Sequence, residues 1–163
     1  MPPNPTDEPN PREDNDPNLA PIPERLTPES LAQEIAFAHA AWERADFAGP
    51  MPAMLEFADS FLRELIQTNP SRAEAYIAGL VKSALPFARR DGGIYCAALA
   101  SVDRAAAERA WATLLETDDA ESVVEAKVGI EERLSDDPSL QSEYDGLDLN
   151  AIRAFYAEVV ESS

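Results

Sequence analysis

Few residues of this chain are of a type that could catalyse a reaction or bind a metal ion, and each lacks the partner residues that such a site needs. His39 is the only histidine, and Glu43 follows it four positions later on the same helical face. A di-metal carboxylate bundle needs Glu-x-x-His motifs from two helices, and serine catalysis needs a nucleophile elbow beside its histidine. The sequence holds neither pattern. We therefore predict no catalytic residue, no metal site and no cofactor, and we interpret His39 as a structural or surface histidine.

Cys96 and a basic doublet flank a pair of glycines. The spacing predicts a turn at Asp91-Gly92-Gly93, which would place Cys96 in the first turn of a helix, where the pKa of a thiol falls. Its neighbours are apolar, so a buried structural thiol is the preferred interpretation. Arg89-Arg90 could hold a phosphate together with the glycine amides. The preferred interpretation is that the doublet neutralises the end of the preceding helix or contacts the acidic segment.

The acidic segment around Gly146 has the composition of a calcium-binding loop, but it lacks ligand residues at the positions where such a loop needs them. If Gly146 is the sixth loop position, Gln141 is the first and Ile152 is the twelfth. Such a loop needs a bidentate glutamate at the twelfth position. The sequence therefore predicts no specific calcium site there.

Negative charge is concentrated in one segment of the chain. The formal net charge is −18, and 10 of those units fall between Glu116 and Asp148, where twelve carboxylates face only Lys127 and Arg133. The carboxylates of such a cluster repel one another and attract a basic partner. The predicted partner-binding residues are Glu116, Asp118, Asp119, Glu121, Glu125, Glu131, Glu132, Asp136 and Asp137.

Helical periodicity and cap signals account for the rest of the chain. Residues 1–26 contain eight of the fourteen prolines and few apolar residues, which predicts a disordered, acidic, Pro-rich tail. Thr27, Asn69, Asp118 or Asp119, and Asp148 or Asn150 are the expected helix caps. The predicted helices cover residues 27–46, 52–67, 70–85, 94–116 (with a possible break at Ser101), 119–137 and 150–160.

These elements predict an all-α domain over residues 27–163, folded as a five- or six-helix antiparallel bundle. Pro86 is expected to kink or end the helix over 70–85. In the helix over 119–137, Val123, Val124, Val128 and Leu134 form a thin inner stripe. We therefore expect this helix to lie at the edge of the bundle. No alternation typical of strands is found, so no sheet is predicted.

Composition excludes several classes of protein. The chain has no segment resembling a secretory signal and no run of 18 apolar residues, so no membrane span is expected. Its acidity disfavours direct binding to nucleic acid or to an anionic membrane. A single cysteine excludes an internal disulfide framework and favours a cytoplasmic setting.

Three functional hypotheses follow from these observations. The first is a non-catalytic interaction module, such as an inhibitor, an immunity protein or an adaptor, that docks a basic surface of a partner protein through residues 116–148. A nucleic-acid-processing enzyme is one form of that partner. The second is a salt-adapted helical protein whose acidity has no specific partner. The third is an enzyme with an unrecognised site, which a pocket combining His39, Arg89 and Arg90 would favour. The oligomeric state is not predicted.

Overall fold

A computed structural model describes residues 26–135 and 146–163, in which helices are joined by short connections and no strand is present. The helices are α2 (Pro28–Arg44), α3 (Ala53–Thr68), α4 (Pro70–Lys82), α5 (Pro86–Leu99), α6 (Arg104–Glu116), α7 (Ala120–Arg133) and α8 (Leu149–Phe155), with a π-helical turn η4 (Tyr156–Val160) at the end. The all-α prediction is therefore confirmed. The described part of the chain contains seven α-helices, more than the five or six expected.

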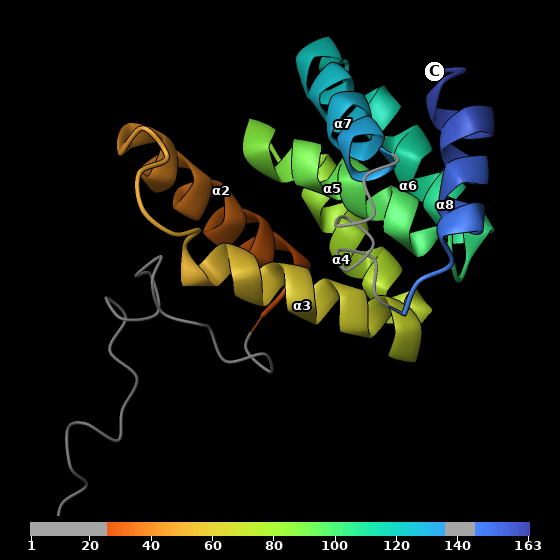
Figure 1. The fold of residues 1–163 in the computed structure, drawn as a ribbon, viewed down its shortest axis with the longest axis horizontal. Helices are drawn as coiled ribbons and strands as arrows, with labels where there is room; N and C mark the ends of the chain where they lie inside the picture. The colour runs from red at the N-terminus through yellow and green to blue at the C-terminus, as the bar shows by residue number, and fades with distance from the viewer. Residues whose placement is uncertain (1–25, 136–145) are drawn as a thin grey trace, which may run out of the picture.

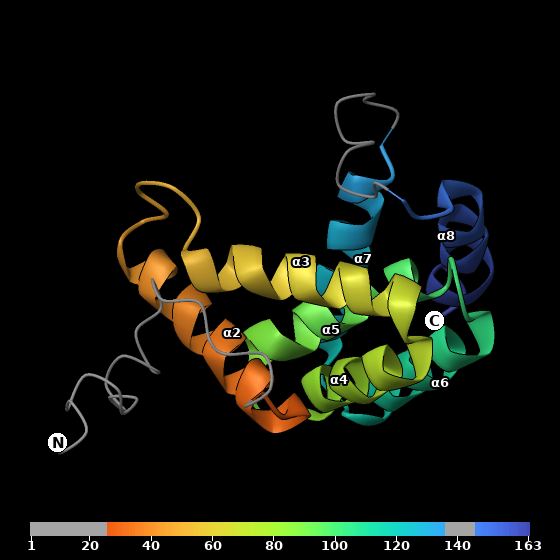
Figure 2. The ribbon, with the colours of Figure 1, turned by 90° about the horizontal axis from the view of Figure 1, so that it is seen from below.

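The helices cross one another at several angles. In both views α3 lies along the long axis of the molecule, while α8 runs across that direction (Figures 1 and 2). Helices α4 and α5 lie at the centre, where α4 packs on α2, α3 and α6, and α5 packs on α4, α6 and α7. None of the described helices is long and apolar enough to cross a membrane.

Local cap signals were predicted correctly. The Thr27 side chain accepts a hydrogen bond from the amide of Ser30, whose own hydroxyl accepts one from the amide of Thr27. Asn69 caps α4, Asp119 caps α7 and Asp148 caps α8 through their side-chain oxygens. These contacts satisfy amides that have no partner within the helix. They explain why these elements begin where the sequence indicates.

The segment around the two central glycines was predicted wrongly. Helix α4 ends before Pro86 as expected, but at Lys82, and Pro86 occupies the first turn of a new helix, α5. The residues Asp91-Gly92-Gly93 lie inside α5 and form no turn. A Cβ atom at position 92 would lie 2.7 Å from Val81, and one at position 93 would lie 2.6 Å from the Cβ of Ala126. The glycines are therefore sites of close approach between α5 and its neighbours.

The break at Ser101 is confirmed, because α5 ends at Leu99 and α6 begins at Arg104 after its cap Asp103. This break and the longer α5 give the additional helix. They also place Cys96 in the last turn of α5, away from any helix N-terminus. Its side chain is fully buried, and burial raises the pKa of the thiol. The structural-thiol interpretation is confirmed, and the first-turn placement is wrong.

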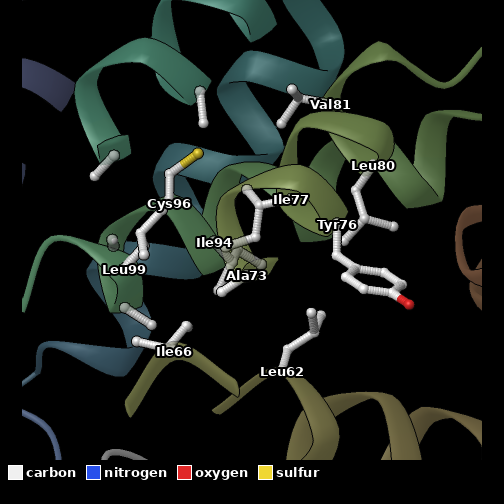
Figure 3. Close-up of a cluster of buried hydrophobic side chains, with 14 of the residues drawn as sticks. Leu62, Ile66, Ala73, Tyr76, Ile77, Leu80, Val81, Ile94, Cys96 and Leu99 are labelled. Carbon is white, nitrogen blue, oxygen red and sulfur yellow. The ribbon is translucent and has the colours of Figure 1, made fainter. Parts of the chain in front are cut away.

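The core is built around α4 and α5. Figure 3 shows Leu62 and Ile66 of α3 facing a layer that includes Ile77 of α4 and Leu99 of α5. Tyr76 is buried at one side of this layer, and its hydroxyl donates a 2.5 Å hydrogen bond to the carbonyl of Leu26. This bond ties the start of the described chain to the centre of the fold.

Candidate functional site

The predicted acidic residues that the structure describes lie on or next to α7. Glu116 ends α6, Asp118 and Asp119 join α6 to α7, and the other four occupy α7 itself. All of them except Asp119 are exposed, and the four on α7 are Glu121, Glu125, Glu131 and Glu132. Asp136 and Asp137 lie outside the described residues.

Asp119 has a structural role. Its carboxylate accepts hydrogen bonds from the amide of Ser122 at 3.2 Å and from the hydroxyl of Ser122 at 2.7 Å. It also pairs with Arg89, whose Nε lies 3.0 Å away. The Ser122 hydroxyl and the Arg89 guanidinium lower the pKa of Asp119 to about 2. Because these bonds hold the start of α7 against α5, Asp119 is not available to a partner in the way its neighbours are.

Arg89 has both of the structural roles that the sequence analysis offers for the basic doublet. Besides its pair with Asp119, it donates a 2.6 Å hydrogen bond to the carbonyl of Ser83 at the end of α4. A cation at this position interacts favourably with the negative end of the helix dipole. The alternative phosphate site is excluded, because the amides of Gly92 and Gly93 lie inside α5.

The outer face of α7 is apolar at its centre and acidic around it. Val124 is 57% exposed and Val128 is 47% exposed, so these valines do not form the inner stripe that the sequence predicts. The buried residues of α7 are Ser122, Ala126, Gly129 and Ile130, and the other two members of the predicted stripe, Val123 and Leu134, are half-buried against the core. Small residues let α7 approach α5 closely, and the periodicity of the helix then turns both valines to solvent.

Glutamates border the two valines. Glu121, Glu125 and Glu132 follow one another at spacings of four and seven residues, which places them in one row beside the valine stripe. On the opposite side, Glu131 accepts a 3.3 Å hydrogen bond from the hydroxyl of Tyr156. We call the set Glu121, Val124, Glu125, Val128 and Glu132 the α7 face. Four of these residues, all but Glu121, also line a groove of about 330 Å³ against α5.

A second feature is a cavity of about 270 Å³ between α2, α3, α5 and α7, which we call the arginine cavity. Charged and polar groups enter it from all four helices, and apolar side chains complete its wall. The polar lining residues are His39, Asp59, Arg63, Arg90, Asp91, Tyr95 and Arg133. The apolar ones are Met51, Leu55, Ile94 and Ala98.

One side of the arginine cavity is organised by Asp91. Its carboxylate lies 3.0 Å from Nε2 of His39 and accepts hydrogen bonds from Nε and Nη2 of Arg90 at 3.2 and 3.1 Å. Burial alone would raise the pKa of Asp91, but the bond to His39 and the charge of Arg90 outweigh it and lower this pKa. Phe87 supports the group, since its ring stacks on His39 at 5.0 Å and lies under the Arg90 guanidinium.

Hydrogen-bonding rules fix the direction of the His39 contact. Nε2 of His39 also lies 3.2 Å from Nη2 of Arg90. A guanidinium only donates, so Nε2 cannot accept from Arg90 while it donates to Asp91. The ionised carboxylate is the stronger partner, and we assign the Nε2 proton to the bond with Asp91.

The other side of the arginine cavity is organised by Asp59. Its carboxylate accepts a 3.1 Å hydrogen bond from the hydroxyl of Tyr95 and pairs with Arg63 at 2.6 Å. Burial and the charge of Asp59 raise the pKa of Tyr95 well above its usual value. Tyr95 therefore remains a protonated donor at neutral pH.

The described residues that line the arginine cavity include no cysteine, serine, threonine or lysine. Its histidine, tyrosine and two aspartates are held in hydrogen bonds to one another or to arginines. The expected combination is also only partly present, since His39 and Arg90 meet here while Arg89 does not line the cavity. Comparison of the chain with protein-family models, characterised proteins and solved structures finds no match. Function is therefore inferred from the geometry of this chain alone.

Proposed function

We propose that this protein is a non-catalytic interaction module that binds a basic surface of a partner protein through the α7 face. The observation that carries the proposal is the exposure of Val124 and Val128 inside a border of glutamates. The valines supply apolar anchors, and the glutamates select a partner whose surface carries lysines and arginines around an apolar side chain. A reducing, cytoplasmic setting belongs to the same proposal, because it suits the single buried thiol.

The two parts of the α7 face contribute in different ways. Each exposed ion pair adds only ~0–1 kcal/mol, so the glutamates mainly raise the association rate and exclude acidic partners. Full burial of a valine is worth ~1.5–3 kcal/mol, and these two are about half buried already, so each can add roughly 1 kcal/mol. Tight binding therefore requires that both valines and the row of glutamates are covered together.

The finer form of the function that we propose is an inhibitor, an immunity protein or an adaptor for a nucleic-acid-processing enzyme. Such enzymes carry basic grooves that hold phosphates. Carboxylates placed one and two helical turns apart on α7 would occupy such a groove as the phosphates do. Glu116 and Asp118 would extend the acidic border beyond the start of α7.

Salt adaptation without a partner is the alternative that must be separated from this function. Residues 26–90 carry a net charge of −2 and residues 91–163 carry −12, whereas general adaptation favours carboxylates on all helices. Thermal melting in KCl discriminates the two explanations. Self-repulsion is mostly screened at a few hundred millimolar salt, where the Debye length is ~4–6 Å. A melting temperature that continues to rise into molar KCl supports salt adaptation.

Parallel affinity captures test the docking proposal. Wild type, the α7 variant E121K/E125K/E132K and the control variant E43K/E56K/E64K are immobilised and exposed to lysate of the native host at low ionic strength. All six glutamates are exposed, and both variants change the net charge equally. Glu121 and Glu56 also both lie in the first turn of a helix, so the variants alter the helix dipole interaction alike.

The proposal predicts a basic protein that wild type and the control variant retain, that the α7 variant does not retain, and that moderate salt releases. Circular dichroism of the three proteins must show the same helix content. Equal retention by both variants, or equal loss from both, would contradict a specific α7 face. Retention of no protein by wild type would also contradict it.

A further inference from the structure

The α7 face borders a groove whose long direction follows α7. This groove of about 330 Å³ is lined by residues of α7 from Val124 to Arg133, but by only Arg90 and Ile94 of α5. The span from Val124 to Arg133 covers about 13.5 Å of helix axis, whereas Arg90 and Ile94 lie one turn apart. In both views α7 runs across the direction of α5 (Figures 1 and 2). An elongated occupant of the groove would therefore lie alongside α7.

The centre of the groove is apolar. Gly129 is buried there, and a Cβ atom at this position would lie 2.7 Å from Cδ1 of Ile94, so Ile94 packs directly on the glycine. Val124 and Val128 stand beside them and are exposed. Because Gly129 has no side chain, the surface of α7 is depressed between its neighbours. One apolar side chain of a partner can pack in this depression, as the side chains of one helix pack between those of another.

Two exposed carboxylates lie at either end of this apolar centre. Glu125 and Glu132 are seven residues apart, which is about 10.5 Å along the helix axis. Within residues 26–135 and 146–163, neither carboxylate is held by an ion pair or a side-chain hydrogen bond. The arginines of the groove are engaged elsewhere, since Arg90 pairs with Asp91 at 3.1 Å and Arg133 has other contacts. The charge that is left to a partner is therefore negative, which is complementary to a basic occupant.

The spacing of the two carboxylates selects the conformation of that occupant. In a helix, residues i and i+7 lie on one face about 10.5 Å apart, and residue i+3 or i+4 lies between them on the same face. In an extended strand, residues on one face are two or four positions apart, which is about 6.6 or 13 Å. Neither strand spacing matches the carboxylates. The groove therefore fits a helix that has basic residues at i and i+7 and an apolar residue at i+3 or i+4.

A second copy of this chain does not meet that description, because none of the described helices carries two cations seven residues apart. We propose that the groove binds one basic amphipathic helix of a partner protein. Its basic residues at i and i+7 pair with Glu125 and Glu132, and the apolar residue between them packs on Val128 and Ile94. This inference rests on the proposed function and specifies which element of the partner the α7 face recognises.

Two synthetic peptides of about 20 residues, alanine-rich to favour the helical state, test the inference. The matched peptide carries arginines at i and i+7 and a leucine at i+4. The register control has the same composition, but its second arginine stands at i+5 and its leucine at i+2, so the three side chains no longer share a face. Circular dichroism must show equal helix content in both peptides. Fluorescence anisotropy with the full chain at low ionic strength should show the matched peptide binding roughly 10-fold more tightly.

A pair of charge-matched variants tests the role of the two carboxylates. E125Q/E132Q removes both proposed ion pairs and should weaken binding of the matched peptide by roughly 10-fold. The control E43Q/E56Q removes two exposed glutamates from α2 and α3, and it should leave this affinity within about twofold of wild type.

Three results would overturn the inference: equal binding of the two peptides, equal weakening by both variants, or no binding of the matched peptide to wild type. Failure of the inference is distinguishable from failure of the proposed function. A basic protein that wild type still captures from lysate would show that the α7 face docks a surface other than such a helix. Capture of no protein contradicts the docking function itself.

Discussion

Replacing Gly93 by alanine tests how closely α5 and α7 pack, which determines where both the α7 face and Arg133 lie. The new Cβ would lie 2.6 Å from the Cβ of Ala126, 3.0 Å from Leu114 and 3.3 Å from Trp111. Carbon atoms prefer separations of about 3.5–4.0 Å, so the helices must move apart by about 1 Å or distort. Overpacking of this kind costs ~1–3 kcal/mol.

Helix propensity acts in the opposite direction and offsets part of the overpacking cost. Alanine inside a helix is favoured over glycine by about 1 kcal/mol. The difference between these two terms predicts that G93A destabilises the protein by roughly 0–2 kcal/mol, measured by urea unfolding followed by circular dichroism. The control is A112G at an exposed position of α6, where propensity alone should cost about 1 kcal/mol.

A double-mutant cycle identifies the contact that is responsible. A126G removes the Cβ atom that the new alanine would meet, so G93A should cost less in the A126G background than in wild type. Stabilisation by G93A of about the amount that A112G costs would refute the reasoning. It would show that α5 and α7 have room for a side chain at this position.

Three further predictions concern other contacts of the fold. D119N keeps the cap but removes the charge that pairs with Arg89, and we expect it to cost about 1 kcal/mol at neutral pH. Because the folded pKa of Asp119 lies at about 2, below its unfolded value of 3.8, this difference from wild type should persist above pH 4 and vanish as pH falls to about 2. A difference that is constant over this range would show that the charge does not matter. Cys96 is buried and its pKa is raised, so a thiol reagent should label it only after unfolding, and rapid labelling of the native protein would contradict its burial. Y76F removes the hydrogen bond to Leu26 and should lower the free energy of unfolding by about 1 kcal/mol in the same urea assay, whereas an unchanged value would show that the bond is replaced by solvent.

The parts of this fold that the sequence predicts are those set by local signals. Thr27, Asn69 and Asp148 mark helix starts because each side chain bonds an amide two or three residues later. The break near Ser101 is likewise visible in the pattern of the chain. All-α architecture follows from the repeated helical periodicity, although the way the helices cross does not.

Contacts between distant segments explain what the sequence could not reveal. A pair of glycines is typical of a turn, but Gly92 and Gly93 lie inside a helix that packs closely on other helices. A Cβ atom at either position would overlap Val81 or Ala126. The same close approach turns Val124 outward, against the prediction that it lies inside. No property of α7 alone distinguishes the two arrangements.

In the candidate sites too, some features are visible in the sequence and others depend on how the helices pack. The acidic surface of α7 is visible as composition, whereas its apolar anchors depend on packing. The arginine cavity was anticipated only in part, as a pocket that combines His39 with Arg90, because the contact of His39 with Asp91 joins positions more than fifty residues apart in the chain. The only local signal was the adjacent Arg90-Asp91 pair, whose significance depends on what α2 and α3 place opposite it.

The most direct test of the docking proposal is the dissociation constant of the captured partner for wild type, E121K/E125K/E132K and E43K/E56K/E64K at one low ionic strength. Reversing three charges removes three exposed attractions and adds three repulsions, which we expect to weaken binding by roughly 100-fold in the α7 variant. The control variant should stay within about threefold of wild type. Equal weakening by both variants would contradict the account, because it would show that total charge, and not the α7 face, attracts the partner.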